Sequence, residues 1–567
     1  MSGIPSKLSL IAGPTDEKLW NITLSQLLLQ KAEDGPSRKC LVFAEDNYRI
    51  TYMDFYRRTL KVAKGLMAAG IVRGDHIGVM AGNCLPYVEL LFAASHVGAV
   101  LVVFNNTYTA LELKSALKHS ECKIIFTIPS IGKVSNAAIL NSLNAELHSA
   151  NLPRLKNVIL LKPERLSRFV RYDSFVELGR DVSDCQLDAR MRTVEASDVC
   201  NLQFTSGTTG SPKAAMLTHN NIVNNGRFIG DRMRLSHNEV ICCPPPLFHC
   251  FGLVLGLLAV LTHGACIVFP SETFNPAAVL QAVSKERCTA LHGVPAMFSA
   301  ELMLANETMD FSDLRTGIVG GAPAPRKLME DLRNTMNLTE LTNTYGMTET
   351  SPATFMTFTD DPIEKRLSTV GKILPHTKAK IIDVDGNILP LGSRGELCVA
   401  GFSLQKGYWQ NPAKTAEVMR TDENGILWMH TGDEAMFDKE GYCSITGRIK
   451  DVIIRGGENI YPLEIEERLV QHPSVVQSSV VGIPCPKYGE TVAAFLQHRP
   501  QNEKPPLEVL RKFVHETLGW HKAPVHIWWL SEGEDFPKTG SGKIKKHVLR
   551  VRGERLQKSA ALERARL

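Results

Sequence analysis

The sequence lacks the features of secreted and nucleic-acid-binding proteins. Its 13 cysteines are dispersed, without C-x-x-C pairs or a histidine cluster at zinc spacing, which is typical of a protein kept in a reducing compartment. The 64 Lys and Arg residues against 59 Asp and Glu residues leave a net charge of +5, too small to predict a nucleic-acid partner. We therefore expect a small-molecule partner and no nucleic acid.

Long apolar runs are also missing. The N-terminus carries early proline and acidic residues instead of the continuous apolar core of a signal peptide. The most apolar stretch begins at Phe251 and is interrupted at His263 and Gly264, short of the roughly 20 residues that a bilayer span needs. We expect no membrane span and interpret this stretch as a buried helix followed by a strand.

The chain does have the size and composition of a multidomain globular protein, with 567 residues of which 44% are hydrophobic. From Thr51, helical stretches alternate with short β-branched runs, the pattern of βα units that feed a parallel sheet. Turn signals from about Thr369 indicate a β-rich subdomain. The predicted fold class is α/β: layered α/β subdomains plus the β-rich subdomain over residues 1–449, and a small α+β domain over residues 450–567.

The last three residues, Ala565-Arg566-Leu567, match the small, basic, leucine pattern of the S-K-L peroxisomal address. This match predicts a peroxisomal location and an import receptor as a partner. The alternative is a charged, frayed helix end in a protein of the cytoplasm.

A phosphate-binding loop is predicted within "FTSGTTGSPKAAMLTHNN", which begins at Phe204. Glycines let backbone N–H groups turn inward as a nest, and the hydroxyls and lysine add donors for a polyphosphate. The alternative is a solvated surface turn. The candidate phosphate-binding residues are Thr205, Ser206, Gly207, Thr208, Thr209, Gly210, Ser211, Pro212 and Lys213.

An ordinary P-loop, G-x-x-x-x-G-K-[ST], does not occur at the two places that come close to it. Lys213 follows Pro212 where the motif needs glycine. In "FPKTGSGKIKK", Ile544 follows Lys543 and Pro537 occupies the position of the first glycine. The sequence therefore does not predict a P-loop NTPase.

Three further segments, "NTYGMTETSP", "WMHTGDEAMF" and "GRIKDVIIRGGENIYPLEIE", join these two loops in one ordered set. In order and separation the five resemble the core motifs of the adenylate-forming superfamily of acyl-CoA synthetases, luciferases and free-standing adenylation domains. The likeness extends from about Leu24 to Ile544 and is greatest to medium-chain fatty acyl-CoA synthetases.

The resemblance implies an acid–thiol ligase that converts a medium-chain fatty or related acid and ATP to an acyl-adenylate, then transfers the acyl group to CoA. AMP and pyrophosphate are released, and ATP, Mg²⁺ and CoA are the implied cofactor and co-substrates. One alternative is an adenylation enzyme that loads a carrier protein. Another is a nucleotide-binding sensor that has kept the fold and lost the chemistry.

The resemblance also assigns the nucleotide contacts. It implies that Tyr345 lies against adenine, that Thr348 bonds the α-phosphate, that Glu349 holds Mg²⁺, and that Asp433 binds the ribose hydroxyls with help from Arg448. Taken singly, the Thr-Glu pair is typical of a helix cap and the aspartate of a turn. The backbone edge expected to line adenine comprises Gly321, Ala322 and Pro323, following Gly320.

Lys543 is assigned the adenylation step, in which it stabilises the developing charge; the alternative is a solvated lysine in a basic run. For the thioester step, the family rotates a mobile C-terminal domain about a hinge that matches Lys450. The segment Gly456-Gly457-Glu458 then replaces the lysine loop beside the pantetheine tunnel.

His249, in "PPLFHCFG", is expected at the acyl site, although a core histidine is an open alternative. This segment has no acid that could pair a substrate ammonium group, which favours a plain carboxylic acid over an amino acid. The candidates for an acyl pocket, each of which could equally be core, are Phe251, Val294, Ile318 and Met347.

Overall fold

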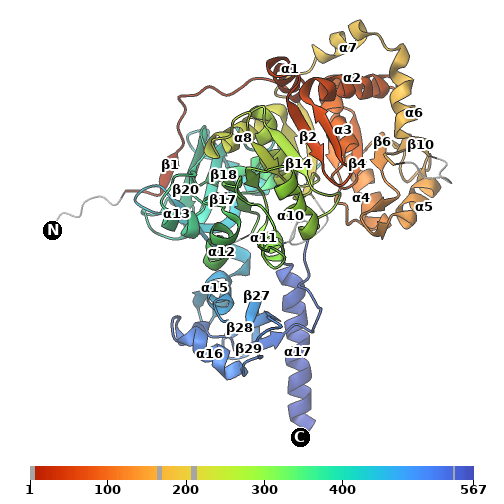
Figure 1. Cartoon of the computed structure of the whole chain (residues 1–567). Helices are drawn as coiled ribbons and strands as arrows, with labels where there is room; N and C mark the ends of the chain where they lie inside the picture. Colours follow the sequence, from red (N-terminus) through yellow and green to blue (C-terminus); the bar gives the residue numbers. More distant parts are fainter. Residues whose placement is uncertain (1–6, 163–168, 206–212, 323, 540–542, 567) are drawn as a thin grey trace.

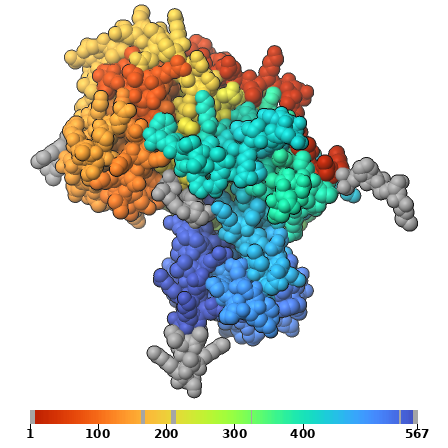
Figure 2. Space-filling view, turned by 180° about the vertical axis from the view of Figure 1, so that it is seen from behind, coloured from red at the N-terminus to blue at the C-terminus, as the bar shows by residue number. Residues whose placement is uncertain are grey.

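The computed structural model describes residues 7–162, 169–205, 213–322, 324–539 and 543–566. A large body carries a smaller C-terminal lobe beneath it in Figure 1, and the long helix α17 (Lys546–Arg566) runs along the side of that lobe and extends below it. Figure 2 shows the same two parts from behind, with the lobe in blue. Among the described helices, none combines the length and apolar character that crossing a bilayer requires.

The first sheet of the body is parallel except at its β11–β12 edge, where the strands form an antiparallel pair. Its central strands are buried along their whole length, because helices cover both faces. Its strands, in spatial order, are β10 (Val170–Arg171), β9 (Asn157–Leu160), β6 (Ile124–Thr127), β4 (His76–Met80), β5 (Val100–Val103), β11 (Val199–Thr205) and β12 (Lys213–Thr218).

The second sheet has parallel central strands and antiparallel strands at both edges. It shares one continuous hydrophobic core with the first sheet. Its strands, in spatial order, are β19 (Lys372–Ile373), β18 (Ala353–Met356), β17 (Glu340–Gly346), β16 (Thr316–Gly320), β15 (Ala290–Leu291), β13 (Val240–Cys242), β14 (Cys266–Phe269), β2 (Lys39–Phe43) and β3 (Tyr48–Thr51).

The third sheet is antiparallel and forms the predicted β-rich subdomain, but it also contains β1, which the sequence reading did not predict. Its strands are β1 (Leu10–Ala12), β20 (Thr377–Ile382), β21 (Gly395–Gly401), β22 (Met419–Thr421), β23 (Leu427–Phe437) and β24 (Cys443–Arg448).

The lobe has its own sheet of β25 (Ile453–Arg455), β26 (Glu458–Ile460), β27 (Val475–Cys485), β28 (Gly489–His498) and β29 (His526–Trp529). A small hairpin joins β7 (Ser130–Ile131) and β8 (Val134–Ser135).

The helices connect and cover these sheets. Those of the body are α1 (Leu24–Asp34), α2 (Tyr52–Ala68), α3 (Leu85–Val97), α4 (Ala110–Ser120), α5 (Ala137–Glu146), α6 (Tyr172–Glu177), α7 (Asp184–Met191), α8 (His219–Arg232), the π-helical segment η2 (Phe251–Leu258), α9 (Ala259–Thr262), α10 (Pro276–Lys285), α11 (Pro295–Leu302), α12 (Arg326–Met336), α13 (Ile363–Ser368) and α14 (Pro412–Val418). The lobe adds α15 (Pro462–Val470) and α16 (Leu507–His515). Short 3₁₀ turns are η1 (Leu178–Asp181), η3 (Thr348–Thr350), η4 (Ile449–Asp451) and η5 (Trp520–Lys522).

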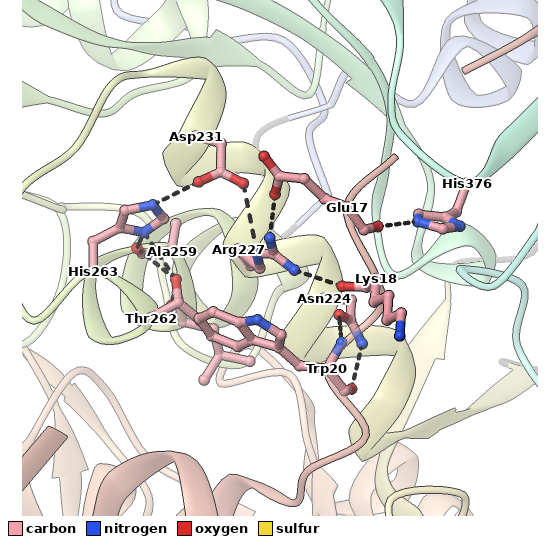
Figure 3. A network of polar contacts seen from close by, with 11 residues as sticks. Glu17, Lys18, Trp20, Asn224, Arg227, Asp231, Ala259, Thr262, His263 and His376 are labelled. Carbon is pink, nitrogen blue, oxygen red and sulfur yellow. Dashed lines mark hydrogen bonds and ion pairs between the residues drawn. The ribbon is translucent and has the colours of Figure 1, made fainter. Parts of the chain in front are cut away.

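The N-terminal segment is fastened to α8 by the polar network in Figure 3. The backbone N–H of Trp20 donates to Asn224 Oδ1 at 2.7 Å, and Asn224 Nδ2 donates to the Trp20 carbonyl at 2.9 Å. Arg227 lies 4.7 Å from the centre of the Trp20 ring and pairs with Glu17. His376 in turn contacts the Glu17 carbonyl, so this segment links α8 to the start of the β-rich sheet.

The α/β class of the body, with its β-rich third sheet and a small C-terminal domain, is confirmed. The apolar stretch from Phe251 is a buried helical segment followed by the strand β14, as expected. At the C-terminus, Ala565 and Arg566 belong to α17, and Leu567 lies outside the described residues.

Candidate active site

Two neighbouring parallel strands, β16 and β17, deliver their following loops to the same edge of the second sheet. Gly320 pairs with Thr344, so the segments that begin at Gly321 and Gly346 leave side by side. Gly321 has a φ of +80°, which favours glycine. A Cβ on Gly346 would lie 1.9 Å from the Pro352 carbonyl oxygen, so this bend requires glycine. The loops therefore bring the adenine-edge and Thr-Glu motifs together.

The phosphate loop connects the paired ends of β11 and β12. Thr205 lies opposite Lys213 in the antiparallel register, so these two predicted residues mark the base of a hairpin. Ser206, Gly207, Thr208, Thr209, Gly210, Ser211 and Pro212 lie outside the described residues, as does Pro323. Ala322 is described and exposed.

Glu349 is held by a tyrosine that the sequence reading missed. Glu349 is 6% exposed, and the Tyr408 hydroxyl donates to its Oε1 at 2.7 Å. Lys213 Nζ lies 5.1 Å from the centre of the Tyr408 ring, a cation–π contact. Tyr408 thus connects the predicted metal ligand to the lysine of the phosphate loop. Burial, and then Glu349, raise the pKa of Tyr408, so its hydroxyl stays a donor.

Asp433 is the second anchored carboxylate. Tyr345 donates to Asp433 Oδ2 at 2.6 Å, and Arg448 Nε lies 3.3 Å from Oδ1. The register of β23 and β24 sets Asp433 opposite Arg448. The three residues predicted for adenine and ribose therefore meet in one place.

Lys543 reaches this place from the C-terminal lobe. Burial lowers the pKa of Lys543, and the positive charge of Arg448 lowers it further, while Asp433 and Glu349 act in the opposite direction. The ammonium group therefore lies close enough to Arg448, Asp433 and Glu349 for their charges to act on it. Its backbone N–H donates to Thr539 Oγ1 at 3.1 Å.

His249 and Cys250 line the side of the site that faces η2. Burial and the nearby charge of Lys543 lower the pKa of His249 to about 3, so its imidazole is neutral at physiological pH. The Cys250 thiol donates to Gln203 Oε1 at 2.7 Å and is also hydrogen-bonded to Thr348. His249 is therefore buried and also close enough to Lys543 for that charge to act on it.

Two buried polar atoms near η2 have no hydrogen-bond partner among the described residues: Gln203 Nε2 and His292 Nδ1. Phe251 packs against His292, and Val294 lies 3.3 Å from the Cβ position at Gly321. Ile318, by contrast, is fully buried within β16, which agrees with its alternative reading as core. Met347 packs against the core of the third sheet.

The predicted hinge and glycine pair lie at the junction of body and lobe. Lys450 is exposed in η4, directly after β24. Gly456 and Gly457, with φ values of +60° and +88°, form the exposed turn between β25 and β26. In this arrangement the lobe presents Lys543 to the site.

A contact across the junction holds the lobe in this orientation. Tyr461 of the lobe donates to Glu434 Oε1 of the body at 2.7 Å, and Arg394 lies 5.2 Å from the centre of its ring. Glu434 directly follows Asp433 in β23. We refer to Tyr461, Glu434 and Arg394 as the junction contact.

The sequence matches two family models: the AMP-binding enzyme family over residues 28–409, and the AMP-binding enzyme C-terminal domain over residues 464–543. The chain belongs to the AMP-binding enzyme family. It is similar to the acyl-CoA ligase sidI of Aspergillus fumigatus, with 53% identity over 99% of this chain and 96% of the relative. It is 37% identical to the mitochondrial medium-chain acyl-CoA ligase ACSF2 of Danio rerio, over 96% and 91% of the two chains.

Solved structures of related enzymes have the same fold. ATP-bound MatB from Rhodopseudomonas palustris superposes with a TM-score of 0.79 at 27% identity, covering 94% of this chain and 99% of that one. The anthranilate CoA ligase AuaEII with anthranoyl-AMP shares the fold, with a TM-score of 0.82 at 22% identity over 97% of this chain and 99% of that one. This AMP-binding enzyme is an adenylate-forming acyl-CoA ligase, for which ATP and CoA are fitting substrates.

Proposed function

We propose that this ligase activates a medium-chain fatty or related carboxylic acid with Mg²⁺ and ATP, and that free CoA accepts the acyl group. The observation that carries the proposal is the convergence of Lys543 with Glu349 and Asp433, although these residues come from the lobe, from the turn η3 and from the strand β23. An isolated motif would have an ordinary structural explanation, but described residues from separate motifs that converge support a single site.

In the first step, a carboxylate must approach the α-phosphate of ATP against electrostatic repulsion. Lys543 supplies a positive charge at that point and stabilises the charge that develops in the transition state. Asp433 binds the ribose hydroxyls, and Tyr345 stacks on adenine while its hydroxyl orients Asp433. Thr348 donates to the α-phosphate, and Thr205 to Lys213 surround the departing pyrophosphate.

Glu349 fits the role of a Mg²⁺ ligand. Its carboxylate is nearly buried, one oxygen is fixed by Tyr408, and the other has no hydrogen-bond donor among the described residues. An oriented oxygen with free lone pairs is what a hard cation needs. The ion would neutralise negative charge on the phosphate oxygens. Glu349 would hold it, and Tyr408 would hold Glu349.

The identity of the acid is supported by two observations. Relatives named medium-chain acyl-CoA ligases match 96% of this chain at 36–37% identity. In addition, Phe248 to Gly252 contain no acidic side chain, and His249 is neutral, so nothing here would pair a substrate ammonium group. A panel of fatty acids of increasing length, with aryl and hydroxylated acids, should show the highest kcat/KM for a medium-chain member. A maximum on an aryl acid would contradict the proposal.

For the second step we propose that the lobe, residues 450–567, rotates about Lys450 and brings Gly456 and Gly457 to the site in place of Lys543. The test is Lys543→Ala, with Lys545→Ala, an exposed neighbour, as the matched control. Lys543→Ala should lower acid-dependent pyrophosphate–ATP exchange at least about a hundredfold, by analogy with loss of a transition-state donor. Preformed acyl-adenylate should still react with CoA.

An equal loss of both half-reactions in Lys543→Ala would contradict the assigned role. If the enzyme forms the adenylate but yields no thioester with CoA alone, the acceptor is a carrier protein instead.

We also propose a peroxisomal location, supported by Ala565-Arg566-Leu567. Removal of these three residues should release a fluorescent fusion from peroxisomes into the cytoplasm, and an unchanged distribution would contradict this role.

A further inference from the structure

Three metal-type donors converge on the third sheet, outside the nucleotide site. Glu396 and Cys398 lie on β21, and His430 lies on β23 directly opposite Cys398 in the antiparallel register. His430 Nδ1 is 3.1 Å from Glu396 Oε2 and 3.5 Å from Cys398 Sγ. All three donor atoms lie within 4.8 Å of one another. One ring nitrogen thus faces a carboxylate and a thiol at the same time.

These distances fit a tetrahedral ion. Zinc binds cysteine sulfur at about 2.3 Å, histidine nitrogen at about 2.0 Å and carboxylate oxygen at about 2.1 Å. Tetrahedral angles then separate the nitrogen from the oxygen by roughly 3.4 Å and from the sulfur by roughly 3.5 Å. The observed nitrogen separations of 3.1 Å and 3.5 Å lie close to these values, and the sulfur and the carboxylate oxygen lie within 4.8 Å of each other.

The types of donor atom favour zinc, and the partial exposure of the group leaves one coordination position open to solvent. Sulfur and imidazole nitrogen favour zinc over Mg²⁺ or Ca²⁺, which prefer oxygen ligands. Cys398 is fully buried, while the side chains of His430 and Glu396 are 18% and 23% exposed, so the ion can enter from the solvent side. Among the described residues no fourth metal-type side chain joins the group, so water completes the coordination.

The group is connected to the nucleotide site through one carboxylate. Glu396 Oε2 faces His430, whereas Glu396 Oε1 accepts the backbone N–H of Gly432 at 3.2 Å. Gly432 has a φ of +70° and immediately precedes Asp433. An ion on Oε2 leaves the Gly432 hydrogen bond intact and restrains the carboxylate that makes it.

We propose that Glu396, Cys398 and His430 form a zinc site that fixes the turn before Asp433. On binding, the Cys398 thiol loses its proton to water and the zinc–sulfur bond replaces it, while His430 keeps one proton on Nε2. Lys380 and Arg420 lie close enough to act electrostatically on Cys398, and they also repel a dication. We therefore expect weaker binding than at closed structural zinc sites, which have four protein ligands.

The binding test uses the full chain after removal of metal with a chelator. Co²⁺ alone is titrated in, and the thiolate-to-cobalt absorption band is followed, then displaced with Zn²⁺. The wild type should bind one equivalent with this band. Cys398→Ser should lose the band, and His430→Asn should weaken binding more than about tenfold, since loss of even a supporting partner costs that much.

Cys443→Ser is the matched control, because Cys443 is a fully buried thiol on β24 of the same sheet. It should bind cobalt as the wild type does. Trp428 packs in the same small cluster as Cys398, so quenching of its emission by Co²⁺ gives a second signal. If no equivalent binds, or if Cys398→Ser and His430→Asn bind as well as the wild type, the zinc site is wrong.

The link to Asp433 is measured by calorimetry of AMP binding, which requires no catalysis. Zinc should tighten AMP binding severalfold in the wild type and in Cys443→Ser, and should have no effect in Cys398→Ser. Zinc that binds at these residues without changing AMP affinity would overturn the link. Because neither experiment uses an acid or CoA, failure here is distinguishable from failure of the proposed reaction.

Discussion

Two clusters in this ligase combine a lysine, a tyrosine and a carboxylate in nearly the same way. In each, the tyrosine hydroxyl donates to the carboxylate, at 2.7 Å in one and 2.6 Å in the other, and the lysine lies over the tyrosine ring. The phosphate-side cluster comprises Lys213, Tyr408 and Glu349. The corner cluster comprises Lys365, Tyr442 and Asp361.

The clusters differ in what remains unpaired. In the corner cluster, Lys365 forms ion pairs with Asp438 and Glu440, and the second oxygen of Asp361 accepts the backbone N–H of Phe358 at 2.7 Å. In the phosphate-side cluster, neither Lys213 nor the second oxygen of Glu349 has such a partner among the described residues. The polar groups of the corner cluster are therefore satisfied by the protein itself. In the phosphate-side cluster, the lysine and one carboxylate oxygen can still bind a ligand.

The largest effect should come from the carboxylates. Glu349→Gln removes the charge that would hold the proposed Mg²⁺, so pyrophosphate–ATP exchange should fall about 10²–10³-fold with little change in Tm. Asp361→Asn should lower Tm and leave exchange within about twofold of wild type. If Glu349→Gln has normal activity, the phosphate-side cluster has no functional role that the corner cluster lacks.

A carboxyl that is buried without a tyrosine partner shows what the tyrosine hydrogen bond contributes. Glu301 is fully buried, neither oxygen has a partner among the described residues, and burial raises its pKa to about 8. The folded state therefore keeps a proton that the unfolded state loses near pH 4.5, so stability should fall as pH rises between these values, by about 1.4 kcal/mol per unit. Over pH 6–7.5 this amounts to about 2 kcal/mol.

Glu301→Gln should remove that pH dependence. Denaturant unfolding of both proteins between pH 5 and 9 measures it, and their difference in unfolding free energy should grow with pH up to about 8 and then level off. Parallel curves would mean that Glu301 ionises in the folded protein as it does in water.

Substitution of the two tyrosines should have the smallest effect on activity, and its effect should be the most specific to Mg²⁺ binding. Tyr408→Phe keeps the ring under Lys213 but removes a hydrogen bond to a carboxylate, worth about 1.5 kcal/mol, so kcat/KM should fall roughly tenfold. The apparent Mg²⁺ requirement, measured as binding of a non-hydrolysable ATP analogue at increasing Mg²⁺, should rise with it. Tyr442→Phe should change Tm only. Equal Mg²⁺ titrations for the two variants would argue against a positioning role for Tyr408.

The sequence predicted the features that depend on local pattern. The alternation of helical and β-branched segments follows from periodicity within each element, so the α/β class was predictable. The meeting of Lys543, Glu349 and Asp433 was also expected, but from ordered motifs and family resemblance rather than from physical reasoning about any one residue.

The features that the sequence did not predict depend on strand register and side-chain packing. Tyr408 is 59 residues from Glu349, and nothing in "KGYW" marks it as a partner. Cys398 and His430 are 32 residues apart and meet only because β21 and β23 pair with those residues opposite each other. A shift of one residue would turn one of them to the other face of the sheet.

The junction contact has a consequence for the timing of turnover. If the lobe rotates between the two steps as proposed, Tyr461 must leave Glu434 before a thiol can enter. The lifetime of that contact then sets how long the reactive acyl-adenylate stays shielded from water. A hydrogen bond that touches no substrate would then affect two quantities. A longer-lived contact would slow turnover, and a shorter-lived one would increase the loss of acyl-adenylate to hydrolysis.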